Sequence, residues 1–579
     1  MKMWEGRSIV TPIEAMGVVR ALIMLCPFVI LVYCVWMLDR GFEITDEAYY
    51  LLLAIHAGLF KFYISAQQWL TAGLWQVTGS ITMFRAAGMI LLTAGSALLG
   101  LGVFSACLCL GLVEDRLESR CVVLAGSIVG AMLYASTINL SPCYNLLASA
   151  GAYAATGMAL LALNCPGIFR RYVLFVLAGA AVAVEALCKP PAGIATLILL
   201  VLWVMIMEGS HPGKLSGSMA MTLGTFIFTC VALLANTTIS EATQAFEQGM
   251  ELFRMVQTET IGTRLLRYVF DYWGHLLIIL KWFALPIAAM IVYAITRRVV
   301  FAALGLIALV FSLICGRYLC GGWNADGSFT TPAAILSMLA MVLIVSMPVW
   351  NKDRKTLALF AGLILHPYAV AVGTGNTLFT QVIDSLAPWG VAVAVPLVAH
   401  HYDDGRKVTA SLIGLCFMAT VTLNIVTSCF RPYHLSLPLT QQDHVISVGG
   451  IGKVRVDAGT YRFLMEVKEA VEACDIRPGA PFIGLYNIPG VAIALQAIPV
   501  STPWLNNREQ AAFILERTPL EGLHEVVLAF QTGDDMASPQ LPQQLASFPS
   551  GYRYCGMATY PYAEQRIKIW QSQSRQPRH

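Results

Sequence analysis

Two adjacent carboxylates, Asp46 and Glu47, are the residues of this chain with the clearest chemical potential. They follow the first long apolar run and precede a second apolar stretch that begins at Tyr49. This order predicts a helix that opens on an acidic pair and lies on a membrane surface. A carboxylate that is partly desolvated at such a surface is suited to take a proton from a hydroxyl or an amine.

A structural explanation of the same residues is also open. Thr45 is a residue type that caps helices, and Asp46 and Glu47 would then occupy the first turn. Acids in that position suit the exposed N–H groups and the helix dipole. The local pattern does not decide between capping and catalysis, so the context of the pair has to be considered.

The composition is that of a polytopic membrane protein. Of the 579 residues, 57% are hydrophobic and 12% are charged, which is about half the charge of a typical soluble protein. A net charge of +3 is too small to indicate nucleic-acid binding. Most of the 15 cysteines lie in apolar runs, where they are interpreted as small buried hydrophobic residues.

About thirteen apolar runs are candidates for membrane spans. They lie near 16–38, 86–112, 121–139, 146–164, 172–188, 192–208, 217–236, 275–295, 299–316, 328–349, 356–373, 386–400 and 408–428. The prolines at 190 and 191 divide the region 172–208, because proline does not continue a helix. The N-terminal segment is not expected to be a cleaved signal, because the run after it approaches spanning length and lacks an obvious cleavage site.

The distribution of basic residues predicts the orientation. One set of connections gathers Arg116, Arg120, Arg170, Arg171, Lys214, Arg297, Arg298, Lys352, Arg354, Lys355, Arg406 and Lys407. This places the N-terminus in the cytoplasm and, with an odd number of spans, the C-terminus outside. The loop 39–85, the stretch 237–274 and the tail 430–579 then share the outer face.

The tail 430–579 is expected to be a separate soluble domain. The pattern predicts a small α/β fold. Helices are expected over 458–474 and near 507–517, and buried strands at 481–486 and 525–530. Cys474 and Cys555 lie in this part and could pair if it is outside. Two thiols in one domain are equally compatible with no disulfide.

An Asp-Glu pair in the first external loop, after a single span, resembles the membrane glycosyltransferases of the GT-C fold class that use lipid-phosphate sugars. Within that class the layout is most similar to the bacterial aminoarabinose transferase and the protein O-mannosyltransferases. The shared features are many spans, a surface-lying helix pair in the first loop and an active site on the outer face. The bacterial member also has an odd number of spans and a periplasmic C-terminal domain.

The resemblance implies a fold and an activity. A transmembrane glycosyltransferase domain over 1–429, with surface helices in 39–85, would precede a periplasmic α/β domain over 430–579. A sugar would move from a polyprenyl phosphate, such as undecaprenyl phosphate, to lipid A, a surface glycan or a surface protein such as pilin, at the bacterial inner membrane. Asp46 is implied as the base that deprotonates the acceptor, and Glu47 as a residue that orients the acceptor or supports a divalent metal.

The phosphate of such a donor needs cations near the outer headgroups. Lys189 is the first candidate, because it ends a span before the Pro-Pro break and related transferases place a lysine near the lipid phosphate. The alternative is that Lys189 only pairs with Glu185 at (i, i+4). Further candidates are Arg317, with its neighbour Tyr318, and Lys281. The side chains of Arg317 and Lys281 could instead extend to the lipid headgroups.

Contacts with sugar or acceptor are expected from Tyr144 and Asn145, at a tight outer turn, and from Tyr49. The same turn is also explained by an interfacial tyrosine. Asp326 and Asp384 are weaker candidates for a second acid. The sequence has no Cys/His cluster with zinc spacing and no glycine loop for a nucleotide, which agrees with a lipid-linked donor. Metal dependence is left open, because members of the fold class differ.

Two other functions are considered. An O-antigen polymerase or ligase would use a diphosphate donor and a long external loop with basic residues, which 237–274 provides through Arg254, Arg264 and Arg267. A secondary transporter would place ionisable groups near the bilayer midplane, often in internal repeats. Here such groups gather at the outer ends of spans. Only the transferase requires Asp46-Glu47.

Overall fold

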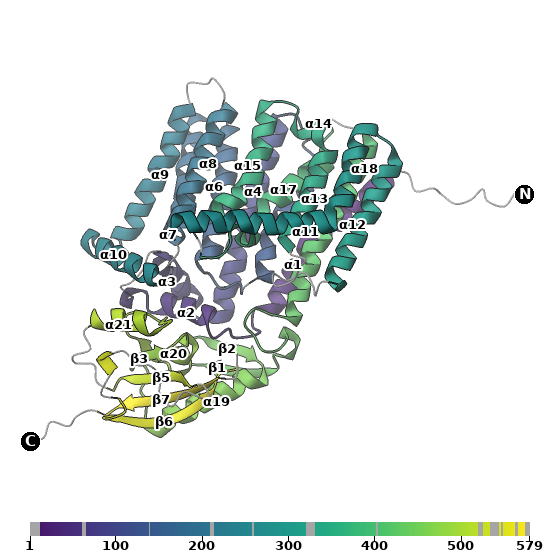
Figure 1. The fold of residues 1–579 in the computed structure, drawn as a ribbon. Coiled ribbons are helices and arrows are strands. Elements are labelled where there is room, and N and C mark those ends of the chain that lie inside the picture. Colours follow the sequence, from purple (N-terminus) through teal and green to yellow (C-terminus); the bar gives the residue numbers. More distant parts are fainter. Residues whose placement is uncertain are drawn as a thin grey trace, which may run out of the picture.

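Long helices and a separate β-sheet make up the two parts of the structure, which is a computed structural model (Figure 1). It describes residues 12–60, 65–137, 139–208, 214–256, 260–319, 331–373, 375–400, 403–518, 525–532, 543–545, 548–561 and 565–573. In Figure 1 the helices form a bundle and the sheet lies beyond one end of it, beside α2 and α3.

The bundle is built from long apolar helices. They are α1 (Pro12–Met37), α4 (Ile81–Cys109), α5 (Leu117–Met132), α6 (Tyr144–Leu163), α7 (Ile168–Cys188), α8 (Pro190–Glu208), α9 (Lys214–Leu234), α11 (Ile261–Thr296), α12 (Val299–Leu319), α13 (Thr331–Val345), α15 (Arg354–Ala371), α17 (Ala387–Val398) and α18 (Asp404–Thr427). Every predicted span falls on one of them. The break between α7 and α8 lies at Lys189, before the two prolines, where the sequence predicts it.

Among the described residues, 10 helices are long and apolar enough to cross a membrane. This number is lower than the predicted count because three of the expected spans do not reach it. Helices α13 and α17 are apolar but short. Helix α15 begins with Arg354 and Lys355, which lower its hydropathy.

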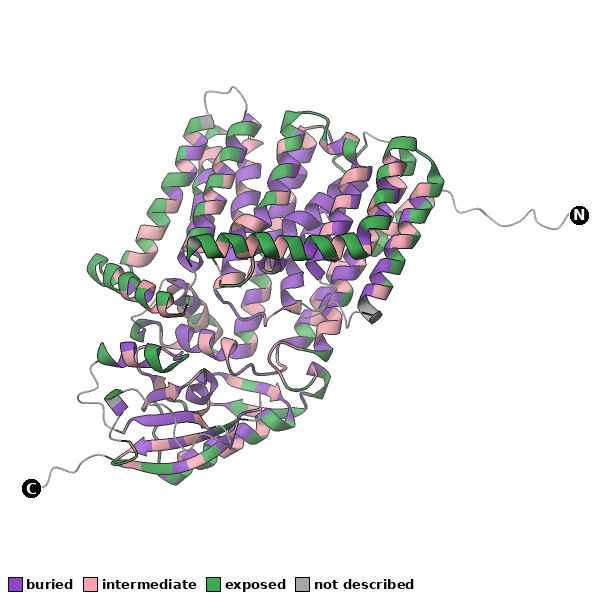
Figure 2. Ribbon diagram, in the orientation of Figure 1, coloured by how far each residue is buried: buried purple, intermediate pink, exposed green. Residues whose placement is uncertain are grey.

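Small residues allow the helices of the bundle to pack closely. Helix α4 faces α6 through glycines, and a Cβ added at Gly95 would lie 2.6 Å from the carbonyl oxygen of Ala150. Close backbone approach of this kind replaces the hydrophobic driving force that is missing inside a lipid bilayer. Figure 2 shows the result, with buried residues in the interior of the bundle and exposed residues on the outer helices.

Shorter elements connect the bundle. The first loop holds α2 (Asp46–Ile55), the 3-10 helix η1 (Ala57–Leu59) and α3 (Gln67–Thr78), so the loop contains the predicted pair of helices. The other short elements are α10 (Ile239–Val256), α14 (Met347–Trp350), α16 (Leu378–Gln381) and the 3-10 helices η2 (Leu133–Ser136), η3 (Val382–Ser385) and η4 (Ser428–Phe430).

The C-terminal part is an α/β domain, as predicted. Its elements are η5 (Leu439–Gln441), β1 (His444–Val448), β2 (Gly452–Val456), α19 (Ala458–Cys474), β3 (Pro481–Leu485), α20 (Pro489–Leu495), β4 (Ile498–Pro499), α21 (Arg508–Glu516), β5 (Val527–Thr532), η6 (Gln543–Leu545), β6 (Tyr552–Thr559) and β7 (Arg566–Ser572). The main sheet has the order β4-β3-β5-β7-β6, with β3 parallel to both of its neighbours. A disulfide joins Cys474 to Cys555, which resolves the question that the sequence left open.

The C-terminal domain is docked on the segment that precedes α2. The backbone N–H of Gly490 and the hydroxyl of Tyr560 both donate to the carbonyl oxygen of Ile44, at 2.9 and 3.1 Å. A Cβ at Gly490 would lie 2.6 Å from that oxygen, so only glycine permits this approach. An ion pair between Arg455 and Asp39, at 2.8 Å, adds a contact at the end of α1. The C-terminal domain therefore holds in place the segment 39–44 that leads to Asp46.

Candidate active site

Glu43 caps the N-terminus of α2. The N-cap residue Thr45 makes no side-chain capping bond. The carboxylate of Glu43 instead accepts hydrogen bonds from the backbone N–H groups of Thr45, at 2.8 Å, and of Glu47, at 2.6 Å. Because Glu43 serves the exposed N–H groups at this end of the helix, Asp46 is not required as a cap.

Asp46 is half-buried and has one hydrogen-bond partner from a distant part of the chain. Its Oδ2 atom accepts from the hydroxyl of Tyr433, which lies between the last helix of the bundle and the C-terminal sheet. Tyr433 is itself stacked on His434, with ring centroids 3.8 Å apart. No other side chain of the described segments is hydrogen-bonded to the Asp46 carboxylate, so its second oxygen is available to a ligand.

Glu47 differs from its neighbour, because both of its oxygens are saturated. Arg85 donates to them through Nε at 2.7 Å and a terminal nitrogen at 2.6 Å. The amide of Asn139 and the hydroxyl of Ser141 donate as well, at 3.0 and 2.5 Å. Glu47 and Arg85 are each only 2% exposed. This geometry orients the loop between α5 and α6 relative to α2 and leaves little room for Glu47 to contact a substrate.

A second buried acid, Glu43, faces His434. Its Oε1 atom lies 3.7 Å from Nδ1 of the imidazole. Burial raises the pKa of Glu43. Burial by itself lowers the pKa of His434, but the hydrogen bond to Glu43 and the charges of Glu43 and Asp46 raise the pKa overall. Three acids, Glu43, Asp46 and Glu47, and the imidazole of His434 therefore lie at the N-terminal end of α2, near the C-terminal domain.

Lys189 lies at the end of α7, 5% exposed, and its ammonium points into the protein. Its Nζ atom donates to the side chain of Asn145 at 3.2 Å and to the carbonyl oxygen of Val370 at 3.0 Å. Glu185 instead accepts from Thr196, at 2.9 Å. Burial lowers the pKa of Lys189 to about 8, against the raising effect of Asp384 and Glu185.

The first turn of α6, which begins at Tyr144, connects Lys189 to the Asp46 side of the site. Nζ of Lys189 lies 5.8 Å from the ring centroid of Tyr144, and that ring lies 6.1 Å from the ring of Tyr50. Tyr50 belongs to α2, and its pKa is raised first by burial and then by groups that include Tyr144 and Asp46. The predicted residues Asp46, Tyr144, Asn145 and Lys189 are therefore brought into one region.

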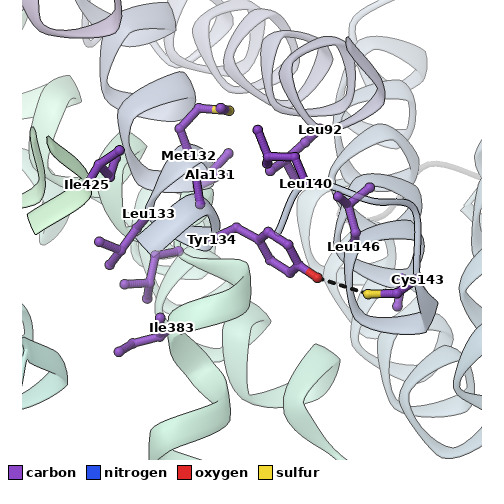
Figure 3. Packing of buried hydrophobic residues seen from close by; sticks show 14 of the residues in the cluster. Leu92, Ala131, Met132, Leu133, Tyr134, Leu140, Cys143, Leu146, Ile383 and Ile425 are labelled. Atoms are coloured by element: carbon purple, nitrogen blue, oxygen red, sulfur yellow. Dashed lines mark hydrogen bonds between the residues drawn. The ribbon is translucent and has the colours of Figure 1, made fainter. Parts of the chain in front are cut away.

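Packing behind this turn holds it in place. Tyr134 and Cys143 are buried and hydrogen-bonded to each other at 2.9 Å, among side chains that include Leu140 and Leu146 (Figure 3). The sequence placed Tyr144 and Asn145 in a turn, whereas the structure places them in the first turn of α6, directly after Cys143. The start of this helix is anchored on the buried cluster, which fixes the backbone that carries the two side chains.

Asp384, a weak candidate from the sequence, belongs to the same region. It lies in η3 and accepts hydrogen bonds from Thr137, at 3.2 Å, and from the amide of Gln381. Burial raises the pKa of Asp384 to about 6, although the charge of Lys189 lowers it. The two groups influence each other across the site without a direct ion pair in the described structure.

Other candidates lie elsewhere or outside the described residues. Lys281 is exposed on α11, with Nζ 5.5 Å from the ring of Trp282, and is not among the groups that surround Lys189. The side chains of Arg317 and Tyr318, and the whole of Asp326, lie outside the described residues.

The remaining predicted contact, Tyr49, faces a residue that the sequence did not single out. Its ring lies 4.9 Å from the ring of Trp504 in the C-terminal domain. Tyr433, His434, Glu43 and Arg85 were also missed. Only the proximity of Glu43 and Arg85 to the Asp-Glu pair in the first loop offered a signal, since the other contacts join distant parts of the chain.

An apolar cavity of about 820 Å³ lies along α11. Its lining is largely aromatic and aliphatic: Leu265, Tyr268, Val269, Phe270, Tyr272, Trp273, His275, Leu276, Ile279, Leu336 and Phe379. Phe379 belongs to α16, directly before the η3 turn that carries Asp384. In the part of the chain that the structure describes, no group of three or more His, Cys, Asp or Glu residues is placed to hold a metal ion.

Comparison with known proteins gives similarity only at the level of structure. No protein-family model matches the chain, and no curated protein is significantly similar to it. An oligosaccharyltransferase from Archaeoglobus fulgidus, in complex with Zn and sulfate, is 12% identical with a TM-score of 0.44, over 87% of this chain and 68% of that one.

ArnT from Cupriavidus metallidurans is similar in two states. Bound to undecaprenyl phosphate it is 14% identical with a TM-score of 0.41, and in the apo state 14% identical with a TM-score of 0.42, over 94% of this chain and 97% of that one in both cases. At these TM-scores the similarity assigns no substrate and no residue role, so function has to be inferred from the site itself.

Proposed function

We propose that this protein is a membrane glycosyltransferase that moves a sugar from a polyprenyl phosphate, such as undecaprenyl phosphate, to an envelope acceptor. The observation that carries the proposal is that an available carboxylate, Asp46, and a buried ammonium, Lys189, lie in one region joined by the rings of Tyr50 and Tyr144. A base and a phosphate-binding cation are the two groups that this transfer needs.

The chemistry follows from this arrangement. Asp46 takes the proton of the acceptor hydroxyl or amine as that atom forms a bond to the anomeric carbon of the donor sugar. The bond from the anomeric carbon to the phosphate oxygen breaks, and its electron pair leaves with the polyprenyl phosphate. Lys189 neutralises the charge on that phosphate. Tyr433 orients the Asp46 carboxylate, and Glu47 acts as a positioning residue through Arg85.

Two further features support the proposal, one for a lipid-linked donor and one for the compartment. The apolar cavity beside α16 offers space for part of a polyprenyl chain close to the segment that carries Asp384. The disulfide of the C-terminal domain agrees with an oxidising compartment, as in a bacterial periplasm. We therefore place the site on the outer face of the inner membrane, with the N-terminus in the cytoplasm.

The central test is Asp46→Asn. Asparagine keeps the size and the hydrogen-bond acceptor but cannot take the proton, so transfer from a polyprenyl-phosphate sugar extract to acceptor should slow by about 10²–10⁴-fold. Glu472→Gln is the matched control, because it makes the same change from carboxylate to amide at an exposed position of α19. Near-parental transfer by Asp46→Asn, at equal protein in the membrane, would disprove the assignment of the base.

A further inference from the structure

Trp504 of the C-terminal domain reaches the helix that carries the proposed base. Its ring meets the ring of Tyr49 edge to face, at 4.9 Å and 61°. Tyr49 lies one helical turn after Asp46, on α2, and its own ring is 5.3 Å from that of Tyr50. The C-terminal domain therefore adds an aromatic side chain to the surroundings of Asp46.

The indole N–H of Trp504 is buried and lacks a hydrogen-bond partner among the described residues. A buried indole donor normally finds an acceptor, because leaving it unpaired costs free energy. Other tryptophans of the described residues share this state, but Trp504 contacts the helix that carries Asp46, where a ligand of the proposed site could supply the acceptor oxygen.

The position of Trp504 in the C-terminal domain also favours contact with a ligand. It lies between β4 and α21, and the next residue, Leu505, accepts a hydrogen bond at 2.9 Å from the backbone N–H of Asn487, just beyond β3. Open α/β sheets bind ligands outside the carboxyl ends of their parallel strands. That edge of the sheet, through Gly490 and Trp504, is the one that meets α2.

We propose that Trp504 and Tyr49 form a subsite for a sugar ring of the acceptor, so that the acceptor is a glycan or glycolipid rather than an unmodified protein. This inference rests on the proposed function. Aromatic side chains with a polar edge combine an apolar face with a hydrogen-bond donor, and a sugar ring presents a C–H face and hydroxyl oxygens. A ring held here would direct a hydroxyl toward Asp46, one turn away.

The test compares Trp504→Leu and Trp504→Phe with Trp570→Leu. Trp570 also has an unpartnered Nε1 among the described residues, but it packs on Phe548 and Tyr554 inside the C-terminal sheet. Binding of glucosamine, mannose and galactose disaccharides to the purified full chain is measured by saturation-transfer NMR without donor. A serine- and threonine-containing peptide serves as the alternative probe.

At least one disaccharide should bind the parent and Trp570→Leu, with about tenfold weaker binding to Trp504→Leu and an intermediate affinity for Trp504→Phe. The KM for acceptor should rise similarly in Trp504→Leu, while the KM for donor stays unchanged. Unchanged thermal midpoints show that the variants are folded, and Trp504→Phe tests the N–H with little change in packing.

Failure of the inference is distinguishable from failure of the proposed function. Equal sugar binding by Trp504→Leu and the parent, or binding of the peptide alone, would overturn the subsite even if the parent transfers sugar. If the parent protein binds sugar through Trp504 but transfers none, the subsite is supported and the proposed glycosyltransferase activity is contradicted.

Discussion

Two ion pairs at the two ends of the helical bundle lie in opposite environments. At the end next to the C-terminal domain, the side chains of Arg85 and Glu47 are 3% and 1% exposed. At the other end, Arg297 and Asp403 form an ion pair in which both side chains are 51% exposed. One pair is removed from solvent and the other lies at the surface.

This difference agrees with the position of the proposed site. A buried charge loses its hydration, and that cost is not repaid unless its partners are well placed. Surface pairs have little such cost and contribute little stability. Burial is not confined to one end, because Glu208 and Arg406 at the opposite end are also buried. The end with Glu43, Glu47, Arg85 and Lys189 differs in that its buried groups surround Asp46, as the proposed site requires.

Breaking the buried pair should give the largest effect on stability. Glu47→Gln leaves Arg85 buried without its charge partner, and loss of one member of such a pair costs about 3–5 kcal/mol. The midpoint of thermal unfolding in detergent should fall markedly. The double variant Glu47→Gln, Arg85→Met should recover part of the loss, because no unpaired charge remains. A single variant as stable as the parent would contradict the role of Glu47 as a positioning residue.

Lys189→Ala tests whether a buried charge at the end next to the C-terminal domain serves function. One lost charge-assisted contact with the donor phosphate is worth about 1.5–3 kcal/mol, so use of the lipid donor should weaken roughly ten- to a hundredfold. Lys189→Arg should retain part of the activity. If Lys189→Ala uses the donor as well as the parent does, the ammonium serves only Asn145 and Val370.

The pH dependence of donor use should reveal the environment of the same residue. The pKa of Lys189 is lowered to about 8 by burial, so the ammonium is present below that pH and is lost as the pH rises through it. In the parent, kcat/KM for the donor should decline above about pH 8. Lys189→Arg should abolish this decline, because arginine stays charged. The same pH profile in both proteins would assign the decline to another group.

The smallest effect is expected at the exposed end. Arg297→Ala removes one of the two ion-pair partners of Asp403, because Arg406 also lies 3.8 Å from that carboxylate. An exposed pair contributes about 0–1 kcal/mol. Thermal midpoint and transfer rate should both stay near parental values. A loss as large as that of Glu47→Gln would mean that the two ends do not differ in the way their burial indicates.

The sequence predicted much of the fold and part of the site. Hydropathy located the helices because spans of a lipid bilayer need continuous apolar runs, and the ends of those runs marked Asp46 and Lys189. It did not reveal Tyr433, which is hydrogen-bonded to Asp46 across 387 residues. Nor did it show that Glu43 would cap α2 in place of Thr45. Such contacts depend on how the C-terminal domain docks, which no local pattern encodes.

The late position of one disulfide has a consequence for how the protein is made. Cys555, which pairs with Cys474, lies close to the end of the chain, as does Tyr560, which is hydrogen-bonded to Ile44. The first loop of the bundle thus receives contacts from residues that follow every candidate span in the chain. A chain synthesised only as far as α18 would hold all of those candidate spans and still lack these contacts, so the surroundings of Asp46 are complete only after the C-terminal domain has folded.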